Sequence, residues 1–313
     1  MVSGRLLVVC KGDQALEVID LASGTTTARI TASAFTPHEV AASADGTRAY
    51  LPIYSDVFLG QPGTDGRRID VVDLVEMRVA DTMPIEFASR PHDAVVGSDG
   101  LLYVGTELDE SVSVFDLSSR SRVGRLPTGR AQSHMFVLSP DVARAYSANV
   151  DTGSVSVIDV ASQELVQVIE VAGKINRISI SPDGSTLFCA DQEQPRLAVI
   201  DVTTTDVSWI ELPSCGFGTA VTPDGRSLVV ALRGASQIGV IDLASRTVVA
   251  QIDVPSQPQE IVVHPDGTRA YSACDAARQV VEVVLTRHEV SRVFPTGVDA
   301  DGICWAPMPV GER

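Results

Sequence analysis

The sequence predicts an all-β protein, a seven-bladed β-propeller with four antiparallel strands in each blade. Three observations predict it: a repeated strand that ends in aspartate, a repeated Asp-Gly dipeptide, and a spacing of about forty residues between copies. The first marker is a short apolar strand that ends in Ile-Asp or a similar pair. It occurs at residues 18–20, 71–73, 114–116, 157–159, 199–201 and 240–242, with a degenerate seventh copy at 281–284.

The second marker, Asp-Gly, suits a tight turn between two strands. It occurs at residues 45–46, 99–100, 183–184, 224–225 and 266–267, with a variant at 140–142. Each unit therefore consists of four short alternating strands, which is typical of propeller blades and not of helical solenoids.

The order of the markers predicts how the ring closes. The chain begins on the second strand of a blade, at residues 6–9, and ends on a first-type strand at residues 302–306. We expect the C-terminal strand to complete the blade that the N-terminus begins, because closure removes two exposed sheet edges. Residues 1–313 then form a single domain, and deletion of the last twelve residues should destabilise all of it.

Two phrases carry a family resemblance. Residues 144–149 read Arg-Ala-Tyr-Ser-Ala-Asn and continue to Ser-Val-Ser-Val-Ile-Asp at 154–159, and residues 269–274 read Arg-Ala-Tyr-Ser-Ala-Cys. The chain resembles the YVTN-repeat propellers over essentially its whole length. The resemblance implies the architecture, but related propellers include lactonases, metal-dependent lyases, electron-transfer subunits and binding modules, so it leaves the chemistry open.

Composition argues against several classes of partner. The formal net charge is -16 and only 24 residues are Lys or Arg, so nucleic acid and anionic membrane surfaces are poor partners. No stretch is long and apolar enough for a membrane helix, and the N-terminus lacks the features of a signal peptide. The five cysteines are isolated, which favours a reducing, cytoplasmic location. No phosphate loop or dinucleotide fingerprint is present, so we expect no nucleotide cofactor.

The candidate site consists of residues that occupy the same position in each repeat. In a propeller the first strand of each blade lines the central channel, so residues at its beginning converge on one mouth. Alignment on the Asp-Gly turns brings seven residues to this position: His38, His92, His134, Arg177, Phe217, Gln259 and Asp301. The other two histidines, His264 and His288, are expected to be ordinary surface residues.

Three histidines on consecutive blades suggest a metal centre. Three neutral imidazoles that leave an open coordination position are the ligand set of a catalytic zinc, copper or iron ion. We therefore predict a divalent transition metal held by His38, His92 and His134. Two alternatives stay open: a metal-free histidine site for acid–base chemistry or ligand binding, and plain polar lining of the channel.

Further residues are assigned roles around that centre. Arg177 is expected to hold a carboxylate or enolate, and Asp301 or Glu107 to move a proton. Loops between second and third strands form a second column on the same face. The substrate-binding candidates come from both columns: Tyr54, Arg233 and Asp191 from these loops, and Phe217 and Gln259 from the channel position.

The residues next to the channel position are expected to face elsewhere. Glu39, Asp93 and Glu260 each follow it by one residue, so strand alternation should turn them into the space between blades. There they should bond to neighbouring backbone or arginine and not act as bases.

Blade two carries an insertion. Residues 54–68 are rich in Gly and Pro and lengthen the connection between its second and third strands, and we predict a loop on the mouth face that could close as a lid. We place it on the blade that bears His92. The alternative is a neutral surface insertion, since long surface loops cost little.

Two classes of function follow. In the first, the protein is an enzyme for a small polar molecule, with a carbonyl or carboxylate, that acts as a lyase, isomerase, cyclase or lactonase-type hydrolase. In the second, the same mouth binds a ligand or a protein without turnover.

Overall fold

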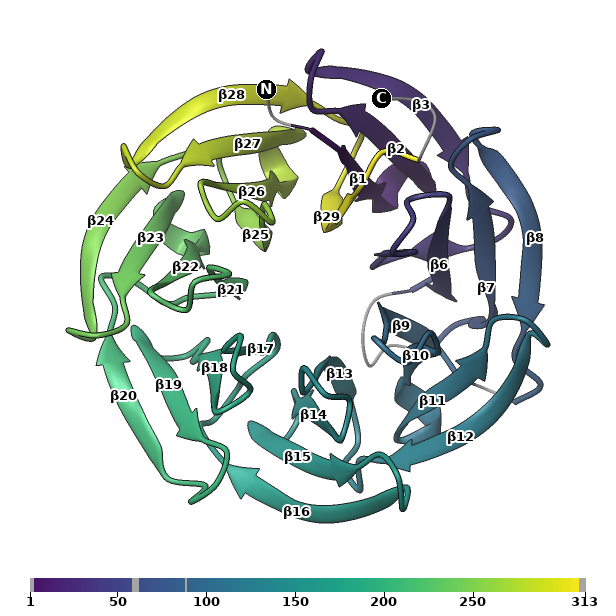
Figure 1. Cartoon of the computed structure of the whole chain (residues 1–313), viewed down its shortest axis with the longest axis horizontal. Coiled ribbons are helices and arrows are strands. Elements are labelled where there is room, and N and C mark those ends of the chain that lie inside the picture. The colour runs from purple at the N-terminus through teal and green to yellow at the C-terminus, as the bar shows by residue number, and fades with distance from the viewer. Residues whose placement is uncertain (1–2, 58–61, 88, 310–313) are drawn as a thin grey trace.

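Seven sheets stand around a central axis in the computed structural model, which describes residues 3–57, 62–87 and 89–309 (Figure 1). The predicted fold is confirmed, with four antiparallel positions per blade. Strands are given from the axis outward. Blade one consists of β29 (Ala300–Ala306), β1 (Arg5–Cys10), β2 (Ala15–Asp20) and β3 (Thr25–Thr31). Blade two consists of β4 (Thr36–Pro37) with β5 (Ala41–Ala42), then β6 (Arg48–Ser55), β7 (Asp65–Asp73) and β8 (Arg78–Pro84). Blade three consists of β9 (Pro91–Val96), β10 (Leu102–Thr106), β11 (Ser111–Asp116) and β12 (Ser121–Pro127).

The remaining blades follow the same order. Blade four consists of β13 (Ser133–Leu138), β14 (Arg144–Asn149), β15 (Ser154–Asp159) and β16 (Glu164–Glu170). Blade five consists of β17 (Ser179–Ile180), β18 (Thr186–Ala190), β19 (Arg196–Asp201) and β20 (Val207–Glu211). Blade six consists of β21 (Thr219–Val221), β22 (Ser227–Leu232), β23 (Gln237–Asp242) and β24 (Thr247–Asp253). Blade seven consists of β25 (Pro258–Val263), β26 (Arg269–Cys274), β27 (Gln279–Val284) and β28 (Glu289–Pro295).

Single 3₁₀ turns join the second and third strands in four blades. They are η1 (Lys11–Asp13), η2 (Glu107–Asp109), η3 (Arg233–Ala235) and η4 (Asp275–Ala277). Each ends on a residue in the left-handed region, which reverses the chain into the next strand. Within the described ranges no helix is long and apolar enough to cross a membrane.

The aspartate that ends the third strand of a blade makes the next turn. In blade three, one carboxylate oxygen of Asp116 accepts hydrogen bonds from the backbone N–H groups of Ser118 and Ser119, at 3.0 and 2.6 Å. Arg120 then takes a φ of 57°, which turns the chain into β12. The seventh copy has Val284 at this place, and its turn is closed by backbone bonds instead. The Ile-Asp marker is therefore a turn signal.

The ring closes as predicted. β29 pairs antiparallel with β1, with Trp305 opposite Leu6 and Ile303 opposite Val8, so the last strand lies beside the first (Figure 1). β1 is buried along its whole length, so the junction lies between sheets and is not an open edge.

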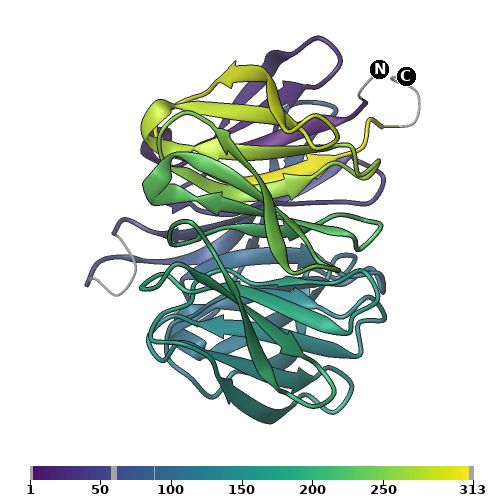
Figure 2. The same cartoon turned by 90° about the vertical axis from the view of Figure 1, so that its left-hand side faces the viewer.

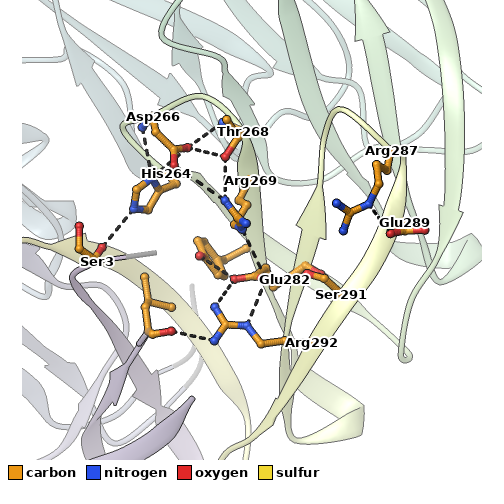
Figure 3. Close-up of polar contacts among 12 residues, drawn as sticks. Ser3, His264, Asp266, Thr268, Arg269, Glu282, Arg287, Glu289, Ser291 and Arg292 are labelled. Carbon is orange, nitrogen blue, oxygen red and sulfur yellow. Dashed lines mark hydrogen bonds and ion pairs between the residues drawn. The ribbon is translucent and has the colours of Figure 1, made fainter. Parts of the chain in front are cut away.

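His264 belongs to this junction, which corrects the expectation that it is a surface residue. It is only 6% exposed, and its Nε2 lies 3.1 Å from the backbone oxygen of Ser3, as Figure 3 shows. Its ring also packs edge-on against Trp305 at 5.6 Å. The N-terminal segment crosses the turn that holds His264 only after the ring has closed, so position beside an Asp-Gly turn gave no sign of this burial.

A second buried network joins blade seven to blade one. Glu282 is 2% exposed and accepts hydrogen bonds from Tyr271, Ser291 and Arg292. Arg292 also donates to the backbone oxygen of Leu21, at 2.7 Å (Figure 3). In the degenerate seventh copy, Glu282 therefore anchors the ring junction instead of being an ordinary strand residue.

The insertion in blade two extends both strands of a hairpin and the loop that connects them. The pairing of β6 with β7 continues from Arg48 opposite Asp73 to Ser55 opposite Asp65, so Asp56 to Thr64 connect the strands. Residues 58–61 lie outside the described residues. Figure 2 shows this hairpin, in slate blue, projecting from one face of the ring. The blade is the one that bears His38, whereas His92 lies on the next blade, which corrects our placement.

Candidate functional site

A β-bulge occurs where the channel residues stand. In blade three, Val104 pairs with Ala94 and Thr106 with Pro91, so His92 and Asp93 together face the single residue Gly105. Three further blades repeat this two-against-one arrangement, at residues 134–135, 259–260 and 301–302. In blade two the inner strand is interrupted, and residues 38–40 lie between β4 and β5. A bulge changes the direction of side chains and interrupts their alternation between the two faces of the strand. It therefore determines which charged side chains meet at the mouth.

Three imidazoles are brought together at this level. The Nε2 of His92 lies 3.1 Å from the Nδ1 of His38, and the ring of His134 lies against the ring of His92 with centroids 3.6 Å apart. Tyr54 of β6 covers the pair, with its ring 4.6 Å from His38 and 5.4 Å from His92. The predicted meeting of the three histidines therefore occurs, under an aromatic cover.

These histidines are held in the neutral form. Burial lowers the pKa of His38 to about 4 and that of His134 to about 3, and it places the pKa of His92 well below its usual value. Arg177 and the neighbouring imidazoles add to the effect for His134 and His92. All three rings are uncharged at neutral pH.

The hydrogen bond between His38 and His92 favours one tautomer pair. The Nδ1 of His92 is buried without a partner among the described residues. A buried N–H without a partner is rarer than a buried acceptor without one, so the proton of His92 belongs on Nε2. His92 then donates to the Nδ1 of His38, and His38 carries its own proton on Nε2.

Only part of this cluster fits a metal ion. Two imidazoles on one tetrahedral ion, with metal–nitrogen bonds of about 2.0–2.1 Å, have ring centres about 5 Å apart. His38 and His92, at 4.8 Å, match that spacing, whereas His92 and His134, at 3.6 Å, are stacked too closely to point at one ion. Within the described residues, no group of three or more His, Cys, Asp or Glu is placed to hold a metal. The three-histidine centre does not fit this arrangement, and we derive no step through a metal.

Arg177 crosses the channel and meets carboxylates from other blades. Its guanidinium lies 2.9 Å from Oε1 of Glu39 and 3.2 Å from Oδ1 of Asp301, and it also pairs with Glu260. Its side chain is only 4% exposed. Glu39 and Glu260 were expected to turn between blades and to bond to backbone or arginine. They do pair with an arginine, but it is Arg177 at the channel position of blade five, and the interrupted strand of blade two and the bulge of blade seven let them reach it. Asp93 follows the expectation in full, since its carboxylate accepts the backbone N–H of Phe136 in the next blade.

The carboxylates of this network titrate differently. Burial raises the pKa of Glu39 to about 8 although Arg177 lies beside it, and burial raises that of Asp93 to about 7. Burial alone would also raise the pKa of Asp301, but Lys11 and Arg177 bring it below its usual value. The Nζ of Lys11 lies 2.9 Å from Oδ2 of Asp301. Asp301 is therefore the permanently ionised member, held between two cations.

A cavity of about 390 Å³ opens above this network. It is lined by Lys11, Gly12, Gln14, Thr36, His38, Asp56, Val57, Asp275 and Asp299. His38 is the member of the imidazole cluster that borders it, and His38 is 9% exposed against 1% for His92. A molecule in the cavity therefore meets His38 first.

Tyr54 and Glu107 form a separate buried pair. The hydroxyl of Tyr54 donates to Oε2 of Glu107 at 2.6 Å, and Arg90 lies 3.9 Å from the other carboxylate oxygen. Tyr54 is fully buried, so its ring supports the histidines and does not touch a ligand. Glu107 borders a different cavity, of about 610 Å³, beside the β6–β7 hairpin.

Phe217 and Arg233 border a third cavity, of about 340 Å³. The guanidinium carbons of Arg233 and Arg177 lie 5.2 and 5.4 Å from the centre of the Phe217 ring. Phe217 lies between two glycines, Gly216 and Gly218. A Cβ on Gly218 would meet the backbone of Gln259 in the next blade, so the close approach there is between blades.

Asp191 and Gln259 are occupied within the protein. Asp191 is 1% exposed and accepts hydrogen bonds from Arg196 and two backbone amides. Gln259 is 3% exposed and donates to Asp275 at 2.9 Å. Neither residue lines the mouth cavity. Gln259 contributes to it only through its hydrogen bond to Asp275, which does line it.

Several cavity residues escaped the sequence assignments. Lys11 and Asp275 stand in the second column of loop residues, and the charge of each was the available signal. Asp56 lies in the insertion that the sequence placed on the mouth face, so its general location was predictable, although it was not named as a candidate. Asp299 gave no such signal, because it precedes the strand that closes the ring.

Comparison with known proteins supports the fold but assigns no specific function. No protein-family model matches the chain, and no curated protein matches it. A chain of Kuenenia stuttgartiensis hydrazine synthase is 17% identical, with a TM-score of 0.76 over 88% of this chain and 90% of that chain. A protein of unknown function from Desulfotomaculum acetoxidans DSM 771 is 12% identical, with a TM-score of 0.77 over 97% of this chain and 99% of that chain. At such identities the likeness shows the fold alone.

Proposed function

We propose that the protein is an enzyme for a small polar molecule and that it acts at the mouth cavity, where His38 donates a hydrogen bond to a carbonyl or carboxylate oxygen of that molecule. One observation carries the proposal: His38 borders the cavity while its other ring nitrogen lies 3.1 Å from the buried His92. This contact fixes both the orientation of the ring and the position of its proton.

A neutral imidazole is a suitable donor for such chemistry. With a pKa near 4, His38 keeps a single proton at neutral pH and can stabilise negative charge that develops on a substrate oxygen. Lyase, isomerase, cyclase and lactonase-type reactions all develop charge on such an oxygen. The choice among them depends on the substrate.

The charged residues have supporting roles in this proposal. Arg177 is saturated by carboxylates, so it positions Asp301 and does not bind the substrate. Asp301 in turn holds the ammonium of Lys11 at the cavity wall. His38 is therefore the residue of this group that we expect to donate to the reacting molecule, and the paired Lys11 forms part of the cavity wall.

The test compares matched histidine variants. Small carbonyl compounds, including lactones and hydroxy acids, are incubated with the protein and followed by NMR for turnover. We expect His38→Asn to lower the turnover of any substrate about 10²-fold or more, and His288→Asn, on an exposed turn, to leave it unchanged. Imidazole ¹⁵N spectra should place the His38 proton on Nε2. A His38→Asn variant with full activity contradicts the proposal, and saturable binding without turnover favours the non-catalytic alternative.

A transition-metal site is the second candidate, favoured by the separation of the His38 and His92 nitrogens. Both atoms could face one zinc, copper or iron ion in place of the hydrogen bond. Metal analysis of protein purified without chelator tests it. A stoichiometric ion that disappears in His38→Ala and His92→Ala supports this candidate, and equal loss in His134→Ala would restore the three-ligand set.

Membership of the YVTN-repeat propellers and a reducing, cytoplasmic location are parts of the same proposal. The motifs at residues 144–149 and 269–274 support the first. The second is supported by the cysteines, since all five are free.

A further inference from the structure

We infer that the ligand of the mouth cavity is a cation, a small primary amine in its ammonium form that also carries a hydrogen-bond acceptor. The inference rests on the proposed site, but it does not depend on turnover. It follows from the charges that line the cavity and from the charges that are already neutralised below it.

Three carboxylates reach the cavity from three different loops. Asp56 comes from the β6–β7 connection, Asp275 begins η4, and Asp299 precedes β29. Asp56 and Asp275 use one oxygen each, to accept hydrogen bonds from Thr64 and from Gln259. Within the described residues the carboxylate of Asp299 accepts no hydrogen bond. Each of the three lining aspartates therefore keeps at least one carboxylate oxygen without a hydrogen bond among the described residues.

The nearby cations are not available to an anion. Lys11 is paired with Asp301 at 2.9 Å, and Arg177 is surrounded by Glu39, Glu260 and Asp301. Arg233 lies 3.9 Å from Asp275. The lining contains three carboxylates and one ammonium, and that ammonium already has a partner. A carboxylate ligand would meet net repulsion here, whereas an ammonium would be attracted.

His38 provides an independent sign of a ligand. Its side chain is nine-tenths buried, and its Nε2 has no hydrogen-bond partner among the described residues although the ring borders the cavity. Because this imidazole is neutral, it does not repel an ammonium. Its N–H fits an acceptor oxygen on the same molecule, so an amine that also carries a carbonyl satisfies both walls.

This narrows the expected substrate class. An amine that also carries a carbonyl can accept a hydrogen bond from His38 and is attracted by the three aspartates. A simple carboxylate can accept the hydrogen bond from His38 but is repelled by the three aspartates. The cavity, at about 390 Å³, has the size of a small-molecule site.

Three probes of similar size test the charge directly: 4-aminobutyramide, butyramide and succinamate. All three carry the same carboxamide and differ in the other end, which is an ammonium, a methyl or a carboxylate. Binding is measured by saturation-transfer NMR and by shifts of the His38 imidazole signals. We expect 4-aminobutyramide to bind about tenfold more tightly than butyramide, to bind less tightly in high salt, and succinamate to bind most weakly.

Matched aspartate variants locate the effect. Asp275→Asn and Asp299→Asn should each weaken the binding of 4-aminobutyramide about fivefold or more and leave butyramide unaffected. Asparagine tolerates the left-handed φ of 55° at residue 299. Glu211→Gln, on the exposed outer strand β20, changes the net charge by the same amount and should have no effect.

Three results would overturn the inference, and they differ in meaning. If all three probes bind equally and His38→Asn abolishes their binding, the site stands and the charge preference is wrong. If none of the probes binds, both the preference and the cavity as a site for amides are wrong. Succinamate binding more tightly than 4-aminobutyramide overturns the charge argument alone.

Discussion

The guanidinium of Arg177 lies 2.9 Å from the carboxylate of Glu39, across the channel and 138 residues away in the sequence. Both side chains are almost fully buried. Blade five is thereby joined through the axis to blade two, as well as to Asp301 of blade one and Glu260 of blade seven. The channel residues are a structural hub at the same time as they shape the mouth.

Replacement of Arg177 by Met should destabilise the protein strongly. Methionine keeps most of the volume but removes the guanidinium that pairs with Glu39, Glu260 and Asp301, and only Asp301 keeps a second cation, Lys11. Loss of one partner of a buried ion pair costs about 3–5 kcal/mol. Urea unfolding measures the change. Arg130→Met, which removes an exposed pair with Glu170 at 3.6 Å, is the control and should cost less than about 1 kcal/mol. Equal effects of the two variants would contradict the hub.

The limits of sequence reasoning are visible at this network. The Ile-Asp and Asp-Gly markers act locally, as the turn at Asp116 illustrates, so they were sufficient to predict seven blades. Strand alternation gave the wrong side for Glu39 and Glu260, because a bulge depends on how two strands pair and not on one strand alone. His264 was missed for a related reason, since Ser3 and Trp305 reach it only through ring closure.

The histidine column was predictable because it is a repeat property. Once the blades are aligned, His38, His92 and His134 must face one mouth. Their stacking was not predictable, since a centroid separation of 3.6 Å rather than 5 Å depends on χ angles. The acidic cavity was equally hidden, because Asp56, Asp275 and Asp299 come from loops that only the closed ring brings together.

Deletion of residues 302–313 should destabilise the whole ring. Ile303 to Ala306 pair with β1, and their loss exposes two buried sheet edges and uncovers His264. We expect thermal unfolding at a much lower temperature and fast amide exchange in blades one and seven. A chain that ends at Pro309 keeps all of β29 and should unfold like the full-length protein. A truncated ring that loses protection only in blade one would argue against cooperative closure.

Gly302→Ala should disturb His38 without a change in any charged group. Gly302 donates its backbone N–H to the carbonyl of His38 at 3.2 Å, and an added Cβ would meet that carbonyl oxygen and lie 2.8 Å from the Cα of Glu39. Because the contact is with backbone, it cannot be relieved by a side-chain rotation. We expect a loss of about 2 kcal/mol or more and shifted His38 imidazole signals.

Gly234→Ala is the matched control for this substitution. A Cβ at Gly234, in η3, meets nothing within 4 Å, so the change should be neutral or stabilise the protein by a few tenths of a kcal/mol. If both alanine variants unfold at the same urea concentration, blade one does not pack on His38 as described.

Two substitutions of Tyr54 should distinguish its two contacts, the packing of its ring on the histidines and the hydrogen bond of its hydroxyl to Glu107. Tyr54→Phe keeps the ring against His38 but leaves the buried carboxylate of Glu107 without its 2.6 Å donor. We expect a stability loss of about 1–3 kcal/mol with unchanged imidazole signals. Tyr54→Ala should in addition move the signals of His38 and His92. Unchanged imidazole signals in Tyr54→Ala would show that the ring does not cover them.

The pH dependence of stability should reveal the neutral histidines in chelator-treated protein. Each histidine has a folded pKa below its usual 6.5, so between about pH 4.5 and 6.5 the unfolded chain binds three more protons at His38, His92 and His134. In the same window the raised pKa values of Glu39 and Asp93 let the folded state hold two protons that the unfolded chain releases. The difference, three minus two, is one proton taken up on unfolding. Stability should therefore fall by at most about 1.4 kcal/mol per pH unit as the pH drops from 6.5 to 5.

Two variants change this slope in opposite directions. Glu39→Gln removes a proton that the folded state holds, so two protons are then taken up on unfolding and the loss of stability toward pH 5 should become about twice as steep. His134→Leu removes one proton from the unfolded side, so the slope should be close to zero. Urea midpoints between pH 5 and 6.5 measure both. A slope that Glu39→Gln flattens, or that His134→Leu leaves unchanged, would mean that these groups do not have the protonation states assigned to them.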